Sequence, residues 1–208
     1  MMTYNKAVGV LNSLLVKKII DSNIIIYSLL QNHPANGDCV KFLEDHDAPD
    51  VLYSLVDCLD ETYWILKNVY RIDADAIIQR LEKLIYTNIQ FLGLNLQDCF
   101  KSLEIQAKNS IQITDARLFL LASAQKIPMI VTDDIRFQTF NRSQGLLTET
   151  PITQDTRKKM AEWEKKNLPE AGLPRILARI HAYLIGRDPK AADSFEHDTF
   201  HFSKLPGA

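Results

Sequence analysis

The chain has 208 residues, of which 46% are hydrophobic and 24% charged, and its formal net charge is −2. This composition is typical of a globular protein with enough chain for one sizeable core, and it excludes an overall basic field that would attract nucleic acid. The three cysteines are widely spaced and form no C-x-x-C pair. A reduced, cytoplasmic protein is therefore expected.

The N-terminal segment is apolar but does not resemble a targeting signal. The stretch "KAVGVLNSLLVKKII" lacks a following small-residue cleavage site. Lys17, Lys18 and Asp21 interrupt it well before it reaches membrane-spanning length. We expect a helix over residues 5–16, within an N-terminal helical extension at 1–16, and no association with a membrane.

From residue 17 onward, short apolar runs alternate with helical patterns. Strands are predicted at 17–23, 50–54, 88–92 and 127–132. Helices are predicted between them, at 23–31, 37–46, 54–70, 73–86, 96–108 and from 114 onward. This alternation predicts an α/β domain with a mainly parallel sheet.

Two helix starts carry specific expectations. Ser54 is predicted to be an N-cap, followed by an apolar stripe on the helix made of Val56, Leu59, Tyr63, Leu66 and Tyr70. Glu61 lies off this stripe. Thr114 is predicted to cap the later helix, which would put Asp115 in the first turn, where the helix dipole favours a negative charge.

Carboxylates stand at the ends of the predicted strands. Asp21 ends the first strand, and Asp133 and Asp134 follow the fourth directly. In open parallel sheets, ligands bind beyond the carboxyl ends of the strands. This rule predicts that Asp21, Asp134 and the helix-opening Asp115 gather at one edge of the sheet.

A cluster of carboxylates calls for a positive charge, because like charges raise one another's pKa. Mg²⁺ or Mn²⁺ would provide it, since both prefer hard oxygen ligands. Such an ion can activate water and neutralise charge that develops on a phosphate. The sequence has no zinc-spaced Cys/His set, no P-loop, no G-x-S-x-G and no G-x-G-x-x-G.

Four segments together resemble the PIN-domain nucleases, including the VapC-type toxins of bacterial toxin–antitoxin pairs: "IIDSNIII" (19–26), "DETYWILKNVY" (60–70), "ITDARLFLLASAQ" (113–125) and "MIVTDDIRF" (129–137). The resemblance covers residues 18–140. That family has an Asp after the first strand, a Glu in a helix, an Asp opening a later helix, and a T-x-D element after the fourth strand. The matching catalytic and metal-binding residues here are Asp21, Glu61, Asp115 and Asp134.

The resemblance implies a three-layer sandwich and a divalent-metal-dependent endoribonuclease that uses Mg²⁺ or Mn²⁺. Its partners would be an RNA substrate, an antitoxin protein and a second copy of the chain. Thr132 matches the hydroxyl position that helps to order the acids, and Asn23 is expected beside the metal or phosphate. Asp133 fills the variable position, where it would point into the site, cap the turn or face solvent.

Other interpretations remain open at this stage. Taken singly, Asp115 is a helix-start charge, Glu61 a solvated helix residue and Asp21 a turn former. The protein could be a PIN-like scaffold that binds RNA or protein without cutting. A metal-dependent phosphatase of the haloacid-dehalogenase type is a further alternative, but those enzymes need D-x-D after the first strand, and the third residue here is Asn23.

The predicted catalytic domain spans 17–145, and a helical C-terminal extension spans 146–208. A charged helix is expected at 154–166. An apolar stripe follows, which we expect to pack on the body or across a dimer interface: Ile176, Leu177, Ile180, Tyr183 and Leu184. Residues 187–208 are expected to be loosely structured.

Overall fold

The computed structural model describes residues 16–109, 111–168, 180–181 and 183–198, and every structural statement below refers to these ranges. Two predictions made from the sequence concern residues that lie largely outside these ranges. The helix predicted at 5–16 lies outside the described residues except at its end, and so do Ile176 and Leu177 of the apolar stripe.

The described residues form a five-stranded sheet in the order β3-β2-β1-β4-β5. Every pair of neighbouring strands is parallel. The strands are β1 Lys18–Ile20, β2 Leu52–Leu55, β3 Gln90–Leu92, β4 Met129–Val131 and β5 Leu147–Glu149. The parallel α/β sheet is thus confirmed, with one strand, β5, that the sequence patterns did not predict.

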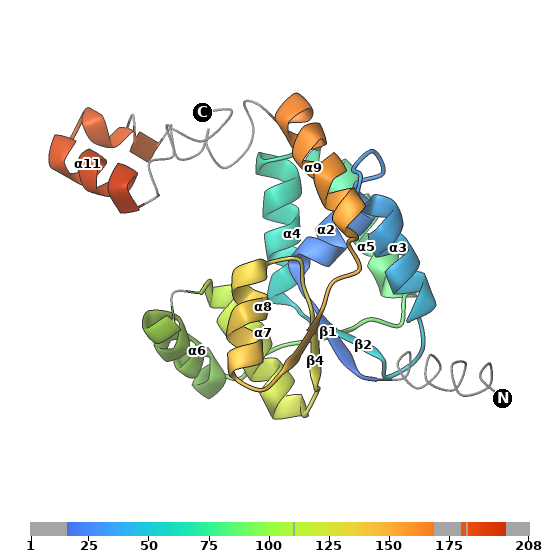
Figure 1. Cartoon of the computed structure of the whole chain (residues 1–208). Helices are drawn as coiled ribbons and strands as arrows, with labels where there is room; N and C mark the ends of the chain where they lie inside the picture. The colour runs from blue at the N-terminus through green and yellow to red at the C-terminus, as the bar shows by residue number, and fades with distance from the viewer. Residues whose placement is uncertain (1–15, 110, 169–179, 182, 199–208) are drawn as a thin grey trace.

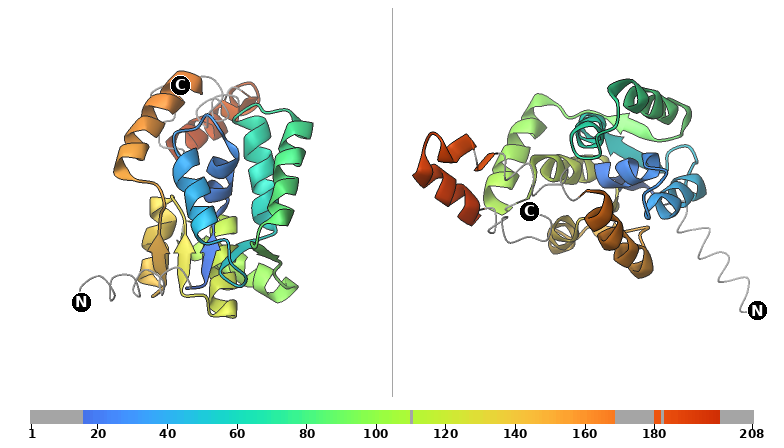
Figure 2. Two further views of the ribbon diagram at one scale, coloured as in Figure 1. Left: turned by 90° about the vertical axis from the view of Figure 1, so that its right-hand side faces the viewer. Right: turned by 90° about the horizontal axis from the view of Figure 1, so that it is seen from above.

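Helices connect the strands and cover both sides of the sheet. Their bounds are α2 Ser22–Leu29, α3 Asn36–Asp45, α4 Asp57–Asn68, α5 Ala74–Glu82 with the 3₁₀ turn η1 Lys83–Tyr86, α6 Leu96–Asn109, α7 Ile113–Gln125, α8 Ile135–Ser143, α9 Gln154–Asn167 and α11 Pro189–Asp198. In Figure 1, α6, α7 and α8 lie together on one side of the strands, and α2 to α5 lie with α9 on the other. Figure 2 shows the same grouping from two further directions. This arrangement confirms the three-layer sandwich.

The central strands are buried on both faces, because helices cover both. Every residue of β1 and of β2 is buried, and Ile19 and Ile20 have no exposed surface. These β-branched side chains suit a pleated surface that packs on each side. Each fully buried Ile contributes about 1.5–3 kcal/mol to the free energy of unfolding relative to an exposed one. Burial of Ile19 and Ile20 therefore holds the C-terminal end of β1 in place.

The structure corrects the two predicted N-caps. Ser54 lies inside β2, where its hydroxyl donates to the Ile20 carbonyl at 2.9 Å, and α4 begins after Val56 instead. Val56 is 44% exposed, so the predicted stripe is also wrong at its first position. Helix α7 begins two residues earlier than expected, after Gln112, which places Thr114 inside the helix. At Ser54 a contact across the sheet outweighs the local cap signal, whereas at α7 the local pair of Gln112 and Asp115 starts the helix earlier.

Residues beyond 145 take part in the fold. Strand β5 pairs with β4, and Glu149 holds the buried Lys18 of β1 at 2.6 Å. Helix α9 spans almost the residues predicted for it, and Ile152 and Met160 bury their side chains in the main core. The prediction that 187–208 is loosely structured is wrong for Pro189–Asp198, which form α11.

Among the described residues, no helix combines the length and the apolar character that a membrane crossing requires.

Candidate active site

The acidic residues meet where the order of the strands reverses. Strand β1 lies between β2 and β4, and Ile20 pairs with Val131 in parallel register. The Asp21 N–H donates to the Val131 carbonyl at 3.0 Å, so the residues that follow the two strands are neighbours. In doubly wound α/β sheets this reversal opens a crevice in which ligands bind.

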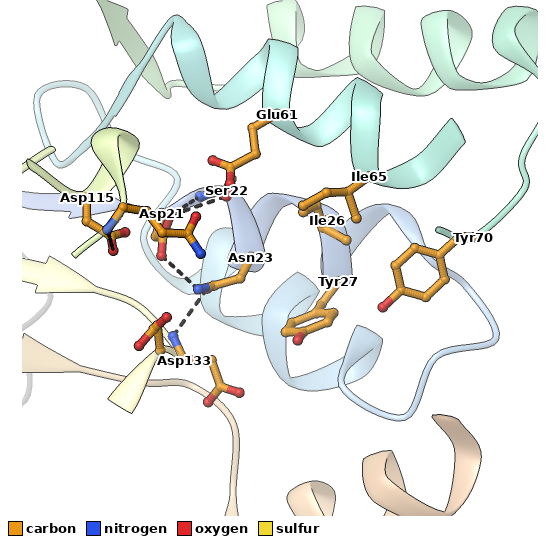
Figure 3. A pocket seen from close by; sticks show the side chains of 12 residues that line it. Asp21, Ser22, Asn23, Ile26, Tyr27, Glu61, Ile65, Tyr70, Asp115 and Asp133 are labelled. Atoms are coloured by element: carbon orange, nitrogen blue, oxygen red, sulfur yellow. Dashed lines mark hydrogen bonds between the residues drawn. The ribbon is translucent and has the colours of Figure 1, made fainter. Parts of the chain in front are cut away.

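A pocket of about 290 Å³ occupies this crevice. Its walls include all four acids that the sequence predicted, Asp21, Glu61, Asp115 and Asp134, together with the supporting residues Asn23 and Asp133. Figure 3 labels each of these residues except Asp134. They come from the start of α2, the first half of α4, the first turn of α7 and the start of α8. The fold therefore brings together carboxylates that lie far apart in the sequence.

Asp21 is held by more hydrogen bonds than Asp134. It is only 4% exposed, and it caps α2. Its Oδ1 accepts from the Ser22 N–H at 2.6 Å, and its Oδ2 accepts from the Thr132 hydroxyl and the Asn23 amide, both at 2.7 Å. Burial raises the pKa of Asp21 to about 6 against the effect of these hydrogen bonds, with a contribution from the charge of Glu61.

Asn23 and Thr132 link the two sides of the crevice. The Asn23 amide nitrogen also donates to the Thr132 hydroxyl oxygen at 3.0 Å, and its oxygen accepts from the Asp133 N–H at 3.2 Å. The Asp134 N–H donates to the Thr132 hydroxyl oxygen at 3.1 Å. This network holds the turn after β4 against the start of α2 and so sets the position of Asp134 relative to Asp21.

Glu61 presents an oxygen that has no protein partner. Burial raises the pKa of its carboxyl group, while the hydroxyls of Ser22 and Thr114 lower it. Within the described residues, its Oε2 is buried without any hydrogen-bond partner. A buried carboxylate oxygen left unpaired is costly, which favours a cation or water in the pocket beside it.

The pKa of Asp115 is raised further than that of Asp21. Its Oδ2 accepts from the Gln112 N–H at 3.2 Å, which closes the start of α7. Burial raises the pKa of Asp115 to about 8, and the charges of Asp21, Asp134 and Glu61 add to this effect. The group therefore holds a proton at neutral pH unless a positive charge joins the cluster.

Asp133 and Asp134 have different surroundings. Asp134 caps α8 through Oδ1, which accepts from the Arg136 and Phe137 N–H groups at 2.7 and 3.0 Å. Asp133 accepts from the Thr150 hydroxyl at 3.1 Å and forms an ion pair with Arg157 of α9. Asp133 thus lines the pocket while it also binds the C-terminal segment.

The carboxylate oxygens of these acids are ligands that a hard divalent cation prefers, but the side chains of the described residues do not already form a coordination site. The described residues contain no group of three or more Asp, Glu, His or Cys side chains already arranged around one point as ligands. Within the described residues, the unpaired Glu61 oxygen and the raised pKa values of Asp21 and Asp115 nevertheless favour a positive charge in this pocket. An oxygen-only donor set of this kind fits Mg²⁺ or Mn²⁺.

Several polar and aromatic residues of the site were not predicted. Ser22, Gln112, Tyr27 and Tyr70 line the pocket, and Arg157 reaches it through Asp133. Ser22 could have been found from its position next to Asp21. Arg157 carries no local signal, because its role depends on a contact with a residue on a distant element.

The fold and the site together define a class of protein: a parallel α/β sandwich with a carboxylate-lined pocket where the order of the strands reverses. The model of the PIN domain family matches residues 18–142, and the chain belongs to that family. One similar solved structure is the VapC20 toxin of Mycobacterium tuberculosis, described as cleaving the sarcin–ricin loop. The likeness has a TM-score of 0.53 at 14% identity and covers 63% of this chain and 97% of the toxin. No curated protein matches the sequence significantly.

Proposed function

We propose that the protein is a divalent-metal-dependent endoribonuclease, and that it acts as the toxin of a toxin–antitoxin pair. The main supporting observation is the pocket at the strand-order reversal, which is lined by Asp21, Glu61, Asp115 and Asp134. One oxygen of Glu61 is buried there with no hydrogen-bond partner in the part of the chain that the structure describes. Membership of the PIN domain family and the likeness to a toxin that cleaves the sarcin–ricin loop support the proposal.

The four acids would hold the ion, and a bound Mg²⁺ or Mn²⁺ would supply a water of lowered pKa and neutralise charge on the phosphate. Asp21 is oriented for this role by Thr132 and Asn23, so its carboxylate has little freedom to turn away. Asp134 uses Oδ1 to cap α8 and can direct its other oxygen to the pocket. The raised pKa values of Asp21, Glu61 and Asp115 mean that these three groups lose protons as the ion binds.

The substrate class follows from access to the pocket. A phosphodiester must enter a crevice at the edge of a sheet, and single-stranded or loop RNA presents its backbone and bases without opening a duplex. We therefore propose cleavage within single-stranded or loop RNA, in the cytoplasm.

Protein partners are part of the proposal: an antitoxin and a second copy of this chain. Leu96, Phe100 and Leu103 form an apolar stripe on α6 and are 74%, 61% and 50% exposed. This stripe is a surface that such a partner could cover. Phe100→Glu should weaken self-association measured by sedimentation if the partner is a second copy.

The test is an RNA cleavage assay with the purified full chain. Mg²⁺ or Mn²⁺ should support cutting of a structured RNA, and EDTA should abolish it. Asp134→Ala and Asp21→Asn should each lower the rate by about 100-fold or more, the range lost when metal-held catalysis is removed. Asp155→Asn, on the exposed first turn of α9, is the control and should cut normally.

Calorimetry distinguishes the non-cleaving scaffold from the nuclease. Mn²⁺ should bind the wild type and bind Asp21→Asn more weakly. A wild type that binds RNA but neither takes up metal nor cuts would favour the scaffold. Activity that survives EDTA or remains at full rate in Asp134→Ala would reject the proposed mechanism.

A further inference from the structure

A second pocket adjoins the acidic one. Its volume is about 240 Å³, and Tyr70 lines both pockets. The loop after α2 contributes His33 to its wall, α5 contributes Arg80 and α9 contributes Trp163. Pockets for drug-sized ligands run from about 300 to 1,000 Å³, so this space suits something smaller, such as one ring system.

Aromatic rings connect the two pockets. Tyr27, which lines the acidic pocket, stacks on His33 with ring centroids 4.7 Å apart and planes within 4°. Trp163 meets His33 at 5.0 Å with an angle of 72° between the rings, and Tyr70 lies 6.2 Å from His33. Figure 3 shows Tyr27 and Tyr70 at the end of the acidic pocket that lies away from Asp115. The rings form a continuous path from the acids into the second pocket.

His33 brings a hydrogen-bond donor that the protein does not use. The side chain is buried, at 3% exposed, and its Nδ1 accepts from the Ala35 N–H at 3.2 Å. Burial lowers the pKa of His33 to about 4, so the ring is neutral at pH 7 and carries its proton on Nε2. Within the described residues, Nε2 has no hydrogen-bond partner. A buried donor left unpaired is costly, which favours a ligand with an acceptor there.

The charges around this pocket favour an uncharged ligand over a phosphate. Burial raises the pKa of Tyr70, and the charge of Glu164 on α9 raises it further, so Glu164 adds negative charge to the shared wall. Arg80 supplies the opposing positive charge, but one of its nitrogens already donates to the Leu29 carbonyl at 3.0 Å. A flat, neutral group with acceptor atoms on its edge matches aromatic walls, a neutral imidazole N–H and the remaining Arg80 donors.

We propose that this second pocket binds one nucleobase of the RNA strand whose phosphate lies at the acids. The base would stack against Trp163 or Tyr70 and accept a hydrogen bond from His33. The inference rests on the proposed function and deepens it by naming a base-reading subsite. Trp163 lies beyond the matched residues 18–142, so the subsite depends on a helix that the family model does not include.

The two tryptophans of the chain make a direct test available. Trp64 is 52% exposed on α4 and lines neither pocket, so Trp64→Phe leaves Trp163 as the only indole. This variant is titrated with a short single-stranded RNA in calcium buffer, and binding is followed independently by the anisotropy of the labelled RNA. Trp163 emission should change saturably with the Kd that anisotropy gives. RNA binding without any change in Trp163 emission would overturn the subsite.

Substitutions test the same contact by affinity. Trp163→Ala should raise the Kd for this RNA by about 5- to 100-fold, the loss expected when one base loses its stacking partner. His33→Phe keeps a ring in the stack but removes the donor, and should raise the Kd by about 2- to 10-fold. Trp64→Ala is the matched control and should bind as wild type. An unchanged Kd in both pocket variants would overturn the proposal.

The outcomes separate this inference from the nuclease proposal. Cutting by the wild type with an unchanged KM in folded Trp163→Ala would reject the subsite and leave the nuclease standing. Saturable quenching of Trp163 by RNA in the Trp64→Phe protein, together with a wild type that never cuts, would support the subsite and reject the nuclease. Circular dichroism checks that Trp163→Ala is folded, and His33→Phe provides the second reading if it is not.

Discussion

Asp115 shows what burial does to a single carboxylate. Its pKa rises to about 8 because the side chain is 8% exposed and three other acids surround it. The unfolded group has a pKa of about 3.9. Between these two values the folded chain holds a proton that the unfolded chain has released, so Asp115 makes metal-free stability fall as the pH rises from about 4 to 8.

Asp115→Asn should therefore stabilise the metal-free protein in a pH-dependent way. In EDTA at pH 8 we expect a gain of about 1–2 kcal/mol, or a melting temperature higher by about 2–8 °C, and almost no gain near pH 4. Thermal denaturation of both proteins across this range measures it. Asp155→Asn, whose side chain is 78% exposed, should show no such trend. A loss of stability at pH 8, or an equal gain at both pH values, would contradict this reading of the cluster.

How far each site residue could be predicted depends on what positions it. Asp21 and Asp134 follow buried strands, and a general rule for parallel sheets gathers strand ends at one edge, so their placement followed from the sequence. Glu61 projects from the middle of a helix, and only the family resemblance marked it. Ser54 was wrongly predicted as a cap because its hydroxyl binds the Ile20 carbonyl across the sheet, a contact that no local pattern encodes.

Among the elements, β5 was missed for a physical reason. It is a three-residue edge strand whose residues are exposed or half-buried, so it lacks the apolar run that marks a buried strand. Tertiary contacts hold it instead. It pairs with β4, and Glu149 meets the ammonium group of Lys18, a side chain that is only 3% exposed.

Glu149→Gln tests how much this contact contributes. The variant leaves the buried Lys18 ammonium without a charged partner, which should cost about 2–3 kcal/mol of unfolding free energy. Urea denaturation measures the loss. Asp45→Asn breaks the exposed ion pair with Lys41 and should cost about 0.5 kcal/mol or less. Equal effects in the two variants would mean that β5 is not anchored through Lys18.

At the scale of the whole molecule, the PIN domain and the segment after it are not independent. Helix α9 touches the body at the site and away from it. Arg157 pairs with Asp133, and the Thr156 hydroxyl donates to Asp38 Oδ2 at 2.6 Å. Burial of Ile152 and Met160 adds an apolar contact to these polar ones. The predicted boundary at 145 therefore separates residues that share one core.

Two truncations measure what this segment contributes to the whole molecule. Deleting 150–208 removes Ile152 and Met160 from the core, each worth about 1.5–3 kcal/mol when buried, and exposes the surface they cover. We expect this protein to aggregate or to change its oligomeric state in light scattering. Deleting 169–208 keeps α9 and should preserve solubility, unless the apolar stripe expected at 174–185 packs on the body or on a second copy. If the protein that lacks 150–208 is as soluble as the full chain and keeps the same number of copies per particle, α9 is dispensable and the shared core does not need it.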